Sequence, residues 1–310
     1  MKKEGVQRKP VSRDDRIFDA VVLTVLFLLM LCFILPFMNI ISLSISDQYA
    51  IMRGDVHFLP KGFNLASYEK LLHTNVVLHS YGNTIFIAAT GCVLSLLMTA
   101  LAAYPLVFAQ FRLQKLYSIF IMFTMWFSGG MVPTYIVMSR YGLVDNMWVL
   151  ILNSLISAYH VLVLKSFYAS IPQSLVESAK IDGANDFRIL FQIVIPLSKA
   201  ALATIALWVV VLHWNDYLNA LVYMRSTENY TLQLIMREMV LSSEVSSMFD
   251  VANLDRSAIS DQLKNAVVVF VMAPMILIYP FFQKYFVKGG MVGAVCTQQI
   301  RFLYRSHHRR

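Results

Sequence analysis

Residues 172–188 read PQSLVESAKIDGANDFR, a polar segment between two long apolar runs. Ser170 stands three residues before Gln173, which is the spacing of a capping box at the start of a helix. A helix that begins there would run through Glu177 and end at Gly183, because glycine readily adopts the left-handed conformation that closes many helices. The sequence therefore predicts a short polar helix followed by a glycine elbow.

A second short helix is predicted after the elbow. Asn185 or Asp186 can cap its first turn, from which it would continue toward Pro196. The first helix carries few apolar side chains, which suits insertion into a cleft of another protein, and a helix lying flat on a membrane surface is the alternative. The apolar residues expected to be exposed on it are Leu175, Val176, Ala179 and Ile181.

The rest of the chain has the composition of a membrane protein. Of its 310 residues, 58% are hydrophobic and 14% are charged, whereas soluble domains carry about 25% charged residues. Six stretches are apolar enough, and close enough to the required length of about 20 residues, to cross a bilayer as helices. We therefore expect an all-α, polytopic membrane protein with six transmembrane helices. The six stretches are Ala20–Ile45, Thr84–Ala109, Tyr117–Val137, Met147–Phe167, Ala200–Tyr223 and Ala266–Phe286.

The basic residues set the expected topology. The tail 1–16 is rich in lysine and arginine, so the positive-inside rule places it, and with six spans also the C-terminus, in the cytoplasm. The polar segment 170–198 is then cytoplasmic and the long segment 224–265 is extracellular. The formal net charge of +8 is accounted for by basic residues at the membrane surface and requires no nucleic-acid partner.

The extracellular segment contains the sequence TLQLIMREMV at residues 231–240. Its apolar residues recur at helical spacing, which predicts a short amphipathic helix. This helix either caps the outer surface of the bundle or contacts an extracellular partner. The polar stretch 242–261 after it is expected to be a flexible loop.

The polar segment resembles the EAA loop of bacterial ABC importer permeases. The residues that carry the resemblance are Glu177-Ser178-Ala179, Gly183 after three further residues, and Ile193-Val194-Ile195-Pro196 after nine more. The resemblance implies a type I ABC importer permease fold, in which this loop docks in a groove of a cytoplasmic ATPase. The residues expected to couple to the ATPase are Glu177, Ser178, Ala179, Lys180, Asp182, Gly183 and Ala184.

Two further stretches resemble the carbohydrate-uptake branch of that family. HWNDYLNAL at 213–221 looks like an element of sugar-transporting permeases, and FSGGMVPTYIVM at 127–138 looks like the branch that imports complex oligosaccharides. The resemblance covers about residues 15–295. It implies a permease subunit of the bacterial plasma (inner) membrane, which is not an enzyme and holds no cofactor or metal, since ATP and Mg belong to the ATPase. The implied partners are a homologous second permease, an ABC ATPase dimer, an extracellular solute-binding protein, an oligosaccharide and membrane lipid.

Candidate substrate contacts come from the fourth and fifth predicted spans. Sugars bind to aromatic faces and to side-chain amides and acids. The expected pathway residues are Trp214, Asn215, Asp216, Tyr217, Asn153 and Tyr159. Asp216 has three possible roles, since it can bind sugar hydroxyls, cap a helix or pair across a subunit interface. In the third span, Gly129, Gly130 and Pro133 are expected to interrupt the helix.

Two other functions fit the sequence less well. A permease of the same fold could carry amino acids or another small solute, but the sugar-type element at 213–221 disfavours this. A self-sufficient secondary transporter would need ionisable residues deep in several spans, and few are present. Residues 17–295 are expected to form one permease domain, and the tail 296–310 departs from the family pattern.

Overall fold

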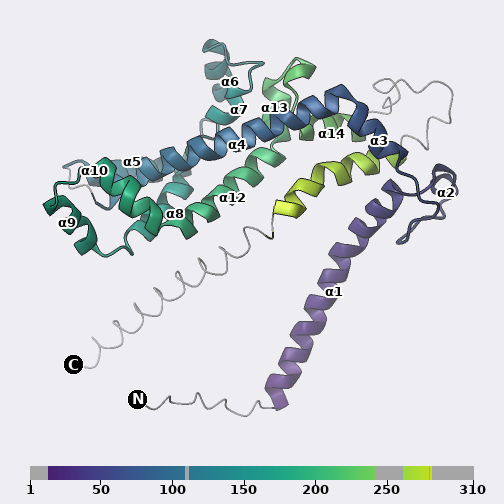
Figure 1. Ribbon diagram of the computed structural model, residues 1–310, viewed down its shortest axis with the longest axis horizontal. Helices are drawn as coiled ribbons and strands as arrows, with labels where there is room; N and C mark the ends of the chain where they lie inside the picture. Colours follow the sequence, from purple (N-terminus) through teal and green to yellow (C-terminus); the bar gives the residue numbers. More distant parts are fainter. Residues whose placement is uncertain (1–12, 109–111, 242–260, 279, 281–310) are drawn as a thin grey trace. The chain divides into compact units, whose positions relative to one another are not determined.

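The computed structural model describes residues 13–108, 112–241, 261–278 and 280 (Figure 1). The regular secondary structure of these residues is helical, apart from an isolated bridge between Ser46 and Phe63. The helices are α1 (Arg13–Ser44), α2 (Gln48–Met52), α3 (Ala66–His73), α4 (Asn75–Ala103), η1 (Tyr104–Leu106), α5 (Gln114–Trp126), α6 (Met131–Arg140), α7 (Trp148–Leu152), α8 (Ala158–Tyr168), α9 (Gln173–Ile181), α10 (Asp186–Ile189), η2 (Leu190–Val194), α11 (Ile195–Leu197), α12 (Lys199–Asn215), α13 (Tyr217–Tyr223), η3 (Thr227–Asn229), α14 (Leu232–Leu241) and an unlabelled helix, Asp261–Ile278.

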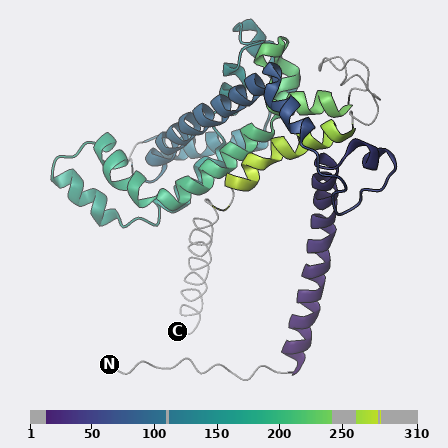
Figure 2. The same cartoon turned by 45° about the vertical axis from the view of Figure 1, so that its right-hand side comes forward.

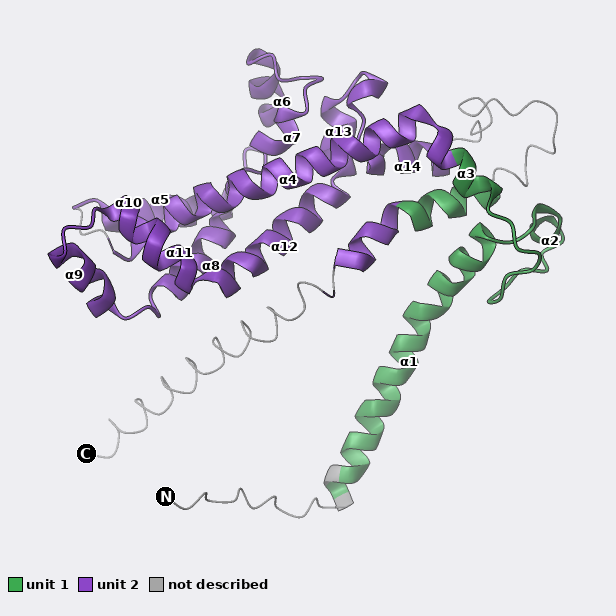
Figure 3. Ribbon diagram, viewed as in Figure 1, with its two compact units in different colours: residues 1–70, 244–270 green, residues 71–243, 271–310 purple. Residues whose placement is uncertain are grey.

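The chain divides into two compact units, residues 1–70 with 244–270 and residues 71–243 with 271–310 (Figure 3). The first unit contains α1, a long apolar helix whose side chains are mostly exposed. At the end of α1, Gln262 donates a hydrogen bond of 2.9 Å to the carbonyl of Ser46. The Tyr68 hydroxyl donates another, of 2.8 Å, to the hydroxyl of Ser44.

The second unit is built around α4, which packs along α12 and α8 (Figures 1 and 2). Small residues on α4 allow the close approach of α12. Gly91 is the tightest point, because a Cβ atom there would lie 2.4 Å from Nε2 of His213. The polar loop α9–α11 lies at one end of these helices, and α13 and α14 lie toward the other (Figure 1).

The predicted spans are confirmed only in part. Three helices are long and apolar enough to cross a membrane, Arg16–Ser44, Asn75–Leu106 and Asp261–Ile278, and two bent pairs raise the number to at most five within the described residues. The third predicted span is one such pair, α5 and α6, which meet at 111°. Gly130 lies in this bend with φ +83°, so the expected interruption is present.

The fourth and fifth predicted spans are each broken into two helices in the structure. The fourth is broken between α7 and α8 over residues 153–157, where the Ser154 hydroxyl donates to the carbonyl of Leu150 at 3.2 Å. The fifth is broken at Asp216, which ends α12 and caps α13. The sixth is helical up to Ile278. Its remainder, apart from Pro280, lies outside the described residues, as do the terminal tails and most of the predicted loop 242–261.

The predicted amphipathic helix is confirmed as α14. Its apolar face is buried, with Leu232, Ile235 and Met239 each 1% exposed. It packs against α4 and α13, so this face belongs to the protein core. This packing agrees with the alternative in which the helix caps the bundle. Contact of its other face with an extracellular partner stays a prediction.

Candidate functional site

The polar loop turns at Gly183, as the sequence predicted. Gly183 has φ +80°, and a Cβ there would meet nothing within 4 Å, so its backbone conformation rather than space requires glycine. The Gly183 amide donates to the carbonyl of Lys180 at 3.1 Å, and the Ala184 amide donates to that of Ala179 at 2.9 Å. These two bonds form a Schellman motif, which closes α9 in a defined geometry.

The two helix starts differ in how well they were predicted. Asn185 caps α10, because its side-chain oxygen accepts a hydrogen bond of 2.8 Å from the amide of Arg188. The capping box at Ser170 is absent, and α9 instead begins after Pro172 with no side-chain cap. The reason is local, since the Ser170 hydroxyl donates to the carbonyl of Phe167 at 2.6 Å and so turns back toward α8.

The apolar residues of α9 face in two directions. Val176 is only 4% exposed and Ala179 packs against the core, so the expectation that both are exposed was wrong. Leu175 remains outside, and Ile181 is 87% exposed. Phe187 on α10, 67% exposed, adds a second large apolar side chain near the elbow. The loop thus presents apolar side chains to its surroundings while Val176 anchors it.

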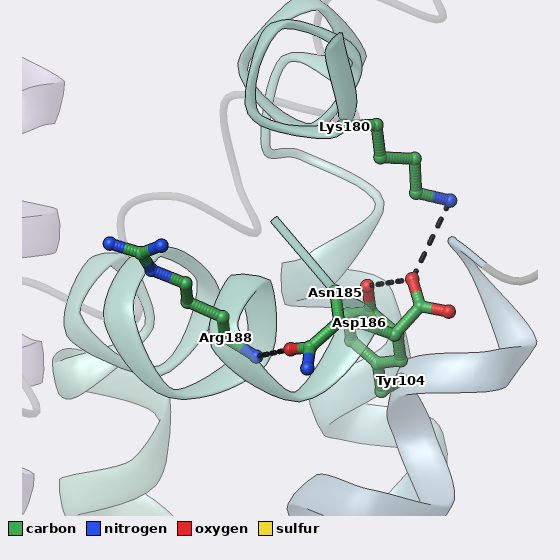
Figure 4. Close-up of polar contacts among 5 residues, drawn as sticks. All are labelled: Tyr104, Lys180, Asn185, Asp186 and Arg188. Atoms are coloured by element: carbon green, nitrogen blue, oxygen red, sulfur yellow. Dashed lines mark hydrogen bonds and ion pairs between the residues drawn. The ribbon is translucent and has the colours of Figure 1, made fainter. Parts of the chain in front are cut away.

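Asp186 ties the loop to the bundle (Figure 4). Its Oδ1 accepts a hydrogen bond of 2.9 Å from the hydroxyl of Tyr104 at the end of α4. The same oxygen lies 3.5 Å from Nζ of Lys180, so this ion pair crosses the elbow. Both charged groups are about half exposed, and the pair adds little stability by itself. The pair nevertheless links α9 to α10 across the elbow.

A continuous apolar core lies beneath these contacts. Residues of α9, α10 and η2 are buried together with residues of α4, α8 and α12. Tyr168 is fully buried and lies 6.1 Å from Phe108 between ring centres. Packed interiors transmit displacement because they compress little. The polar loop is therefore continuous with α4, α8 and α12 through one packed core.

The expected coupling residues occupy different environments within this loop. Lys180 pairs across the elbow, and the Ser178 hydroxyl donates to the carbonyl of Ser174 at 2.8 Å. Glu177 and Asp182 are exposed and form no ion pair among the described residues. Glu177 borders a hollow of about 460 Å³ between α9 and the end of α4, lined also by Val107, Phe108, Gln173, Val176, Lys180 and Asp186.

The two broken spans meet at their breaks, where four of the six expected pathway residues lie. Asn153, at the end of α7, donates a hydrogen bond of 3.3 Å to Oδ1 of Asn219 on α13. The amide group of Asn219 donates in turn to both carboxylate oxygens of Asp216, at 3.0 and 2.8 Å. Asp216 also caps α13, because its Oδ1 accepts a hydrogen bond of 3.1 Å from the Asn219 amide; sugar binding and pairing across a subunit interface stay predictions. Non-helical backbone at membrane depth is tolerated where it lines a cavity or is buried in protein.

Helix α14 adds two polar side chains next to these breaks. Gln233 donates a hydrogen bond of 3.3 Å to Oδ1 of Asn215. The Arg237 guanidinium lies 5.3 Å above the ring of Tyr217. We call the resulting set the outer amide surface; it comprises Asn153, Asn215, Asp216, Tyr217, Asn219, Gln233 and Arg237.

The other two expected pathway residues lie apart from this surface. Trp214 is 4% exposed, and its Nε1 donates to the carbonyl of Val271 at 3.1 Å, so it braces helices against each other. Tyr159 is half exposed and packs against Trp208, with ring centres 5.5 Å apart. It borders a hollow of about 410 Å³ beside the break between α7 and α8, lined also by Thr124, Ser154, Ser157, His160 and Leu212.

Sequence reasoning missed a clasp around Asp145. This residue adopts φ +61° between α6 and α7, and its carboxylate accepts hydrogen bonds from the amides of Arg225 and Ser226 and from the Ser226 hydroxyl. These bonds hold the pKa of Asp145 well below its usual range. Asn83 fixes the same segment from α4 by donating to the carbonyls of Glu228 and Tyr230.

Comparisons with known proteins assign the family. Residues 88–289 match the family described as the binding-protein-dependent transport system inner membrane component. The chain belongs to this family. Membership of this family explains why the chain has long apolar helices. The chain is a transport subunit of a bacterial inner membrane rather than an enzyme. Transporters of this family work with a solute-binding protein and an ATPase.

Several members of the family are similar over nearly the whole chain. The polygalacturonan/rhamnogalacturonan transport system permease protein YtcP of Bacillus subtilis (strain 168) is 35% identical over 91% of this chain and 99% of the relative. Protein LplC of the same organism is 35% identical over 92% of this chain and 96% of the relative. A chain in the crystal structure of a bacterial ABC transporter for the acidic polysaccharide alginate is 34% identical and covers 90% of this chain and 100% of that chain, with a TM-score of 0.83.

Proposed function

We propose that this protein is a permease subunit of an ATP-driven importer of oligosaccharides, and that the α9–α10 elbow couples it to a cytoplasmic ATPase. The observation that carries the proposal is the anchoring of the elbow. A Schellman turn at Gly183, the contacts of Asp186 and the burial of Val176 fix the loop to the helix core. Such a loop can transmit force because it cannot slip against the bundle.

The outward face of the elbow would enter a groove on the ATPase. Ile181 and Phe187 are large apolar side chains exposed within a polar loop. Burying them would provide apolar area, and the seven coupling residues 177–180 and 182–184 would surround this contact. Closure of an ATPase dimer on ATP and Mg would then move α4, α8 and α12 and switch the pathway between its two openings.

Two observations support the proposal that the cargo is an oligosaccharide: the cargoes for which the relatives are named, and the outer amide surface. YtcP is named for polygalacturonan and rhamnogalacturonan, and the solved transporter imports alginate. Amide side chains such as those of Asn153 and Asn215 hydrogen-bond sugar hydroxyls. The full assembly would contain a homologous second permease, an ATPase dimer and an extracellular binding protein. The chain would cross the bilayer six times, with both termini and the loop 170–198 in the cytoplasm.

Site-directed crosslinking tests the coupling contact. In a background with Cys32, Cys92 and Cys296 replaced by serine, Ile181→Cys and Phe187→Cys should each crosslink to the ATPase in the purified complex. Tyr141→Cys, on an exposed residue outside the loop, serves as the control and should not crosslink. If neither loop cysteine captures the ATPase, the docking role of the elbow is wrong.

Cargo is tested separately in proteoliposomes. The complete complex with its binding protein should hydrolyse ATP faster when oligosaccharide is added, and this chain alone should not accumulate solute. Accumulation by the isolated chain would contradict the proposal, because an importer permease depends on its ATPase.

A further inference from the structure

Arg237 is the cationic group of the outer amide surface. It projects from α14, and its guanidinium lies 5.3 Å from the centre of the Tyr217 ring on α13. Arg237 is partly buried, while Tyr217 is 42% exposed. A cation over an aromatic face is attracted to the ring, which fixes the position of the guanidinium.

No carboxylate pairs with this guanidinium in the described part of the chain. Asp216 is adjacent to Tyr217, but Asn219 donates to both of its oxygens. Glu238 follows Arg237 directly; burial raises the pKa of its carboxyl and attraction to Arg237 lowers it, but the two side chains form no ion pair. Stacking also leaves the edge of a guanidinium accessible, and that edge matches the two oxygens of a carboxylate.

The neighbouring side chains favour a ligand that carries hydroxyl groups as well as a negative charge. Asn215 and Gln233 hydrogen-bond each other at 3.3 Å, and the amide groups still have donor and acceptor positions for hydroxyls. Tyr217 offers an aromatic ring edge next to them. The chemistry that combines a carboxylate with many hydroxyls on a compact ring is that of a uronic acid unit in a carbohydrate.

We propose that Arg237, stacked on Tyr217, binds the carboxylate of a uronate unit, and that the cargo of this permease is an acidic oligosaccharide. The inference rests on the proposed import of oligosaccharides and specifies its substrate class. Asn215 and Gln233 contact the hydroxyls of the same unit. Arg237 is therefore a specificity-determining residue of the permease, beyond any selection made by the binding protein.

The test compares two cargoes with the same sugar backbone, one with free carboxylates and one with uncharged methyl esters. The complete complex with its binding protein is reconstituted in zwitterionic nanodiscs, and ATP hydrolysis is measured with trigalacturonate and with its methyl ester. In Arg237→Gln, half-maximal stimulation by trigalacturonate should require about ten-fold more sugar or more, since a charge-assisted contact is lost. Stimulation by the ester should change by less than about two-fold. The same binding protein delivers both sugars, so a selective change reports on the permease.

Matched variants separate charge from folding. Arg237→Lys keeps the charge without the planar fork and should lie between wild type and Arg237→Gln. Arg140→Gln removes an exposed arginine elsewhere and should leave the response to both sugars at the wild-type level. Equal loss of response to acid and ester in Arg237→Gln would overturn the proposal and indicate a structural role.

An anionic lipid headgroup is the other source of a negative group for Arg237. The assay is therefore repeated in nanodiscs with phosphatidylglycerol. Our proposal expects the acid-selective loss in both lipids. A loss that occurs only with phosphatidylglycerol, whichever sugar is present, would assign Arg237 to lipid and overturn the proposal. Wild-type stimulation by the ester but not by the acid would overturn the acidic class while leaving oligosaccharide import intact, and no stimulation by either sugar would count against both.

Discussion

The hydroxyl of Tyr104 donates a hydrogen bond of 2.9 Å to Asp186, although 82 positions separate the two residues. Tyr104 ends the longest helix of its unit and is 6% exposed, whereas Asp186 begins α10. The bond therefore connects the elbow to α4 directly. Since Asp186 also faces Lys180, a single carboxylate contacts both α9 and the end of α4.

Tyr104→Phe should weaken this connection. The ring stays in the core, and the lost hydrogen bond costs about 1 kcal/mol, equivalent to roughly five-fold in the population of the docked loop. We expect oligosaccharide-stimulated ATP hydrolysis by the complete complex to fall while the unstimulated rate stays similar. Tyr141→Phe removes a hydroxyl from an exposed tyrosine and serves as the control. Unchanged stimulation in Tyr104→Phe would show that the bond has no part in coupling.

Gly183 gives a second prediction, because its φ of +80° disfavours any residue with a Cβ. Gly183→Val should cost about 1–3 kcal/mol of backbone strain. We expect the protein to reach the membrane but to lose stimulated ATP hydrolysis in the reconstituted complex. Gly183→Asn should retain much of it, since asparagine tolerates this region.

Gly129→Ala is the matched control for the elbow, because a Cβ there meets nothing within 4 Å and no positive φ is required. Its stimulated rate should equal that of the wild type. If Gly183→Val behaved like Gly129→Ala, the conformation of the elbow would be irrelevant to coupling.

The packing of α4 on α12 leads to a third prediction. A Cβ at position 91 would lie 2.4, 2.8 and 3.0 Å from three atoms of the His213 ring, so Gly91→Ala should overpack this contact and cost about 1–3 kcal/mol. His213→Ala removes the ring. The double variant should be more stable than the sum of the single effects predicts, which thermal unfolding of the purified complex can measure.

Gly82→Ala on the same helix meets nothing within 4 Å and should be neutral or slightly stabilising. Strict additivity of Gly91→Ala and His213→Ala would mean that the two residues do not compete for space.

The elbow could be predicted from sequence because its signals are local. Gly183, the Asn185 cap and the amphipathic spacing of α14 each depend on residues a few positions apart. Tyr104 and Asp186, or Arg237 and Tyr217, meet only through the tertiary fold, so spacing gave no indication of them. The breaks at Asp216 and at residues 153–157 were missed for another reason. Hydropathy sums the apolarity of side chains but does not weigh the competition of serine, asparagine and aspartate for backbone hydrogen bonds.

The last prediction concerns the clasp at Asp145 and its dependence on pH. The folded protein lowers the pKa of Asp145 below its ordinary value of 3.8, with the Ser226 hydroxyl as the largest cause. The carboxylate therefore stabilises the fold at neutral pH. This contribution declines as the pH falls below the ordinary value and is lost when the pH passes the folded pKa. Protection of the Arg225 and Ser226 amides from hydrogen exchange should follow the same course.

Substitutions distinguish this charge effect from general acid unfolding. Asp145→Ala loses every acceptor and places a Cβ-bearing residue without a polar side chain at φ +61°. It should lower the protection factors of the Arg225 and Ser226 amides already at neutral pH. Asp145→Asn keeps one acceptor oxygen and tolerates the conformation, so its protection should be intermediate and nearly independent of pH in the acid range. Asp55→Ala, on an exposed aspartate of the other unit, should leave these amides unchanged. Wild-type protection in Asp145→Ala would show that Asn83 and the surrounding packing hold the segment without the carboxylate.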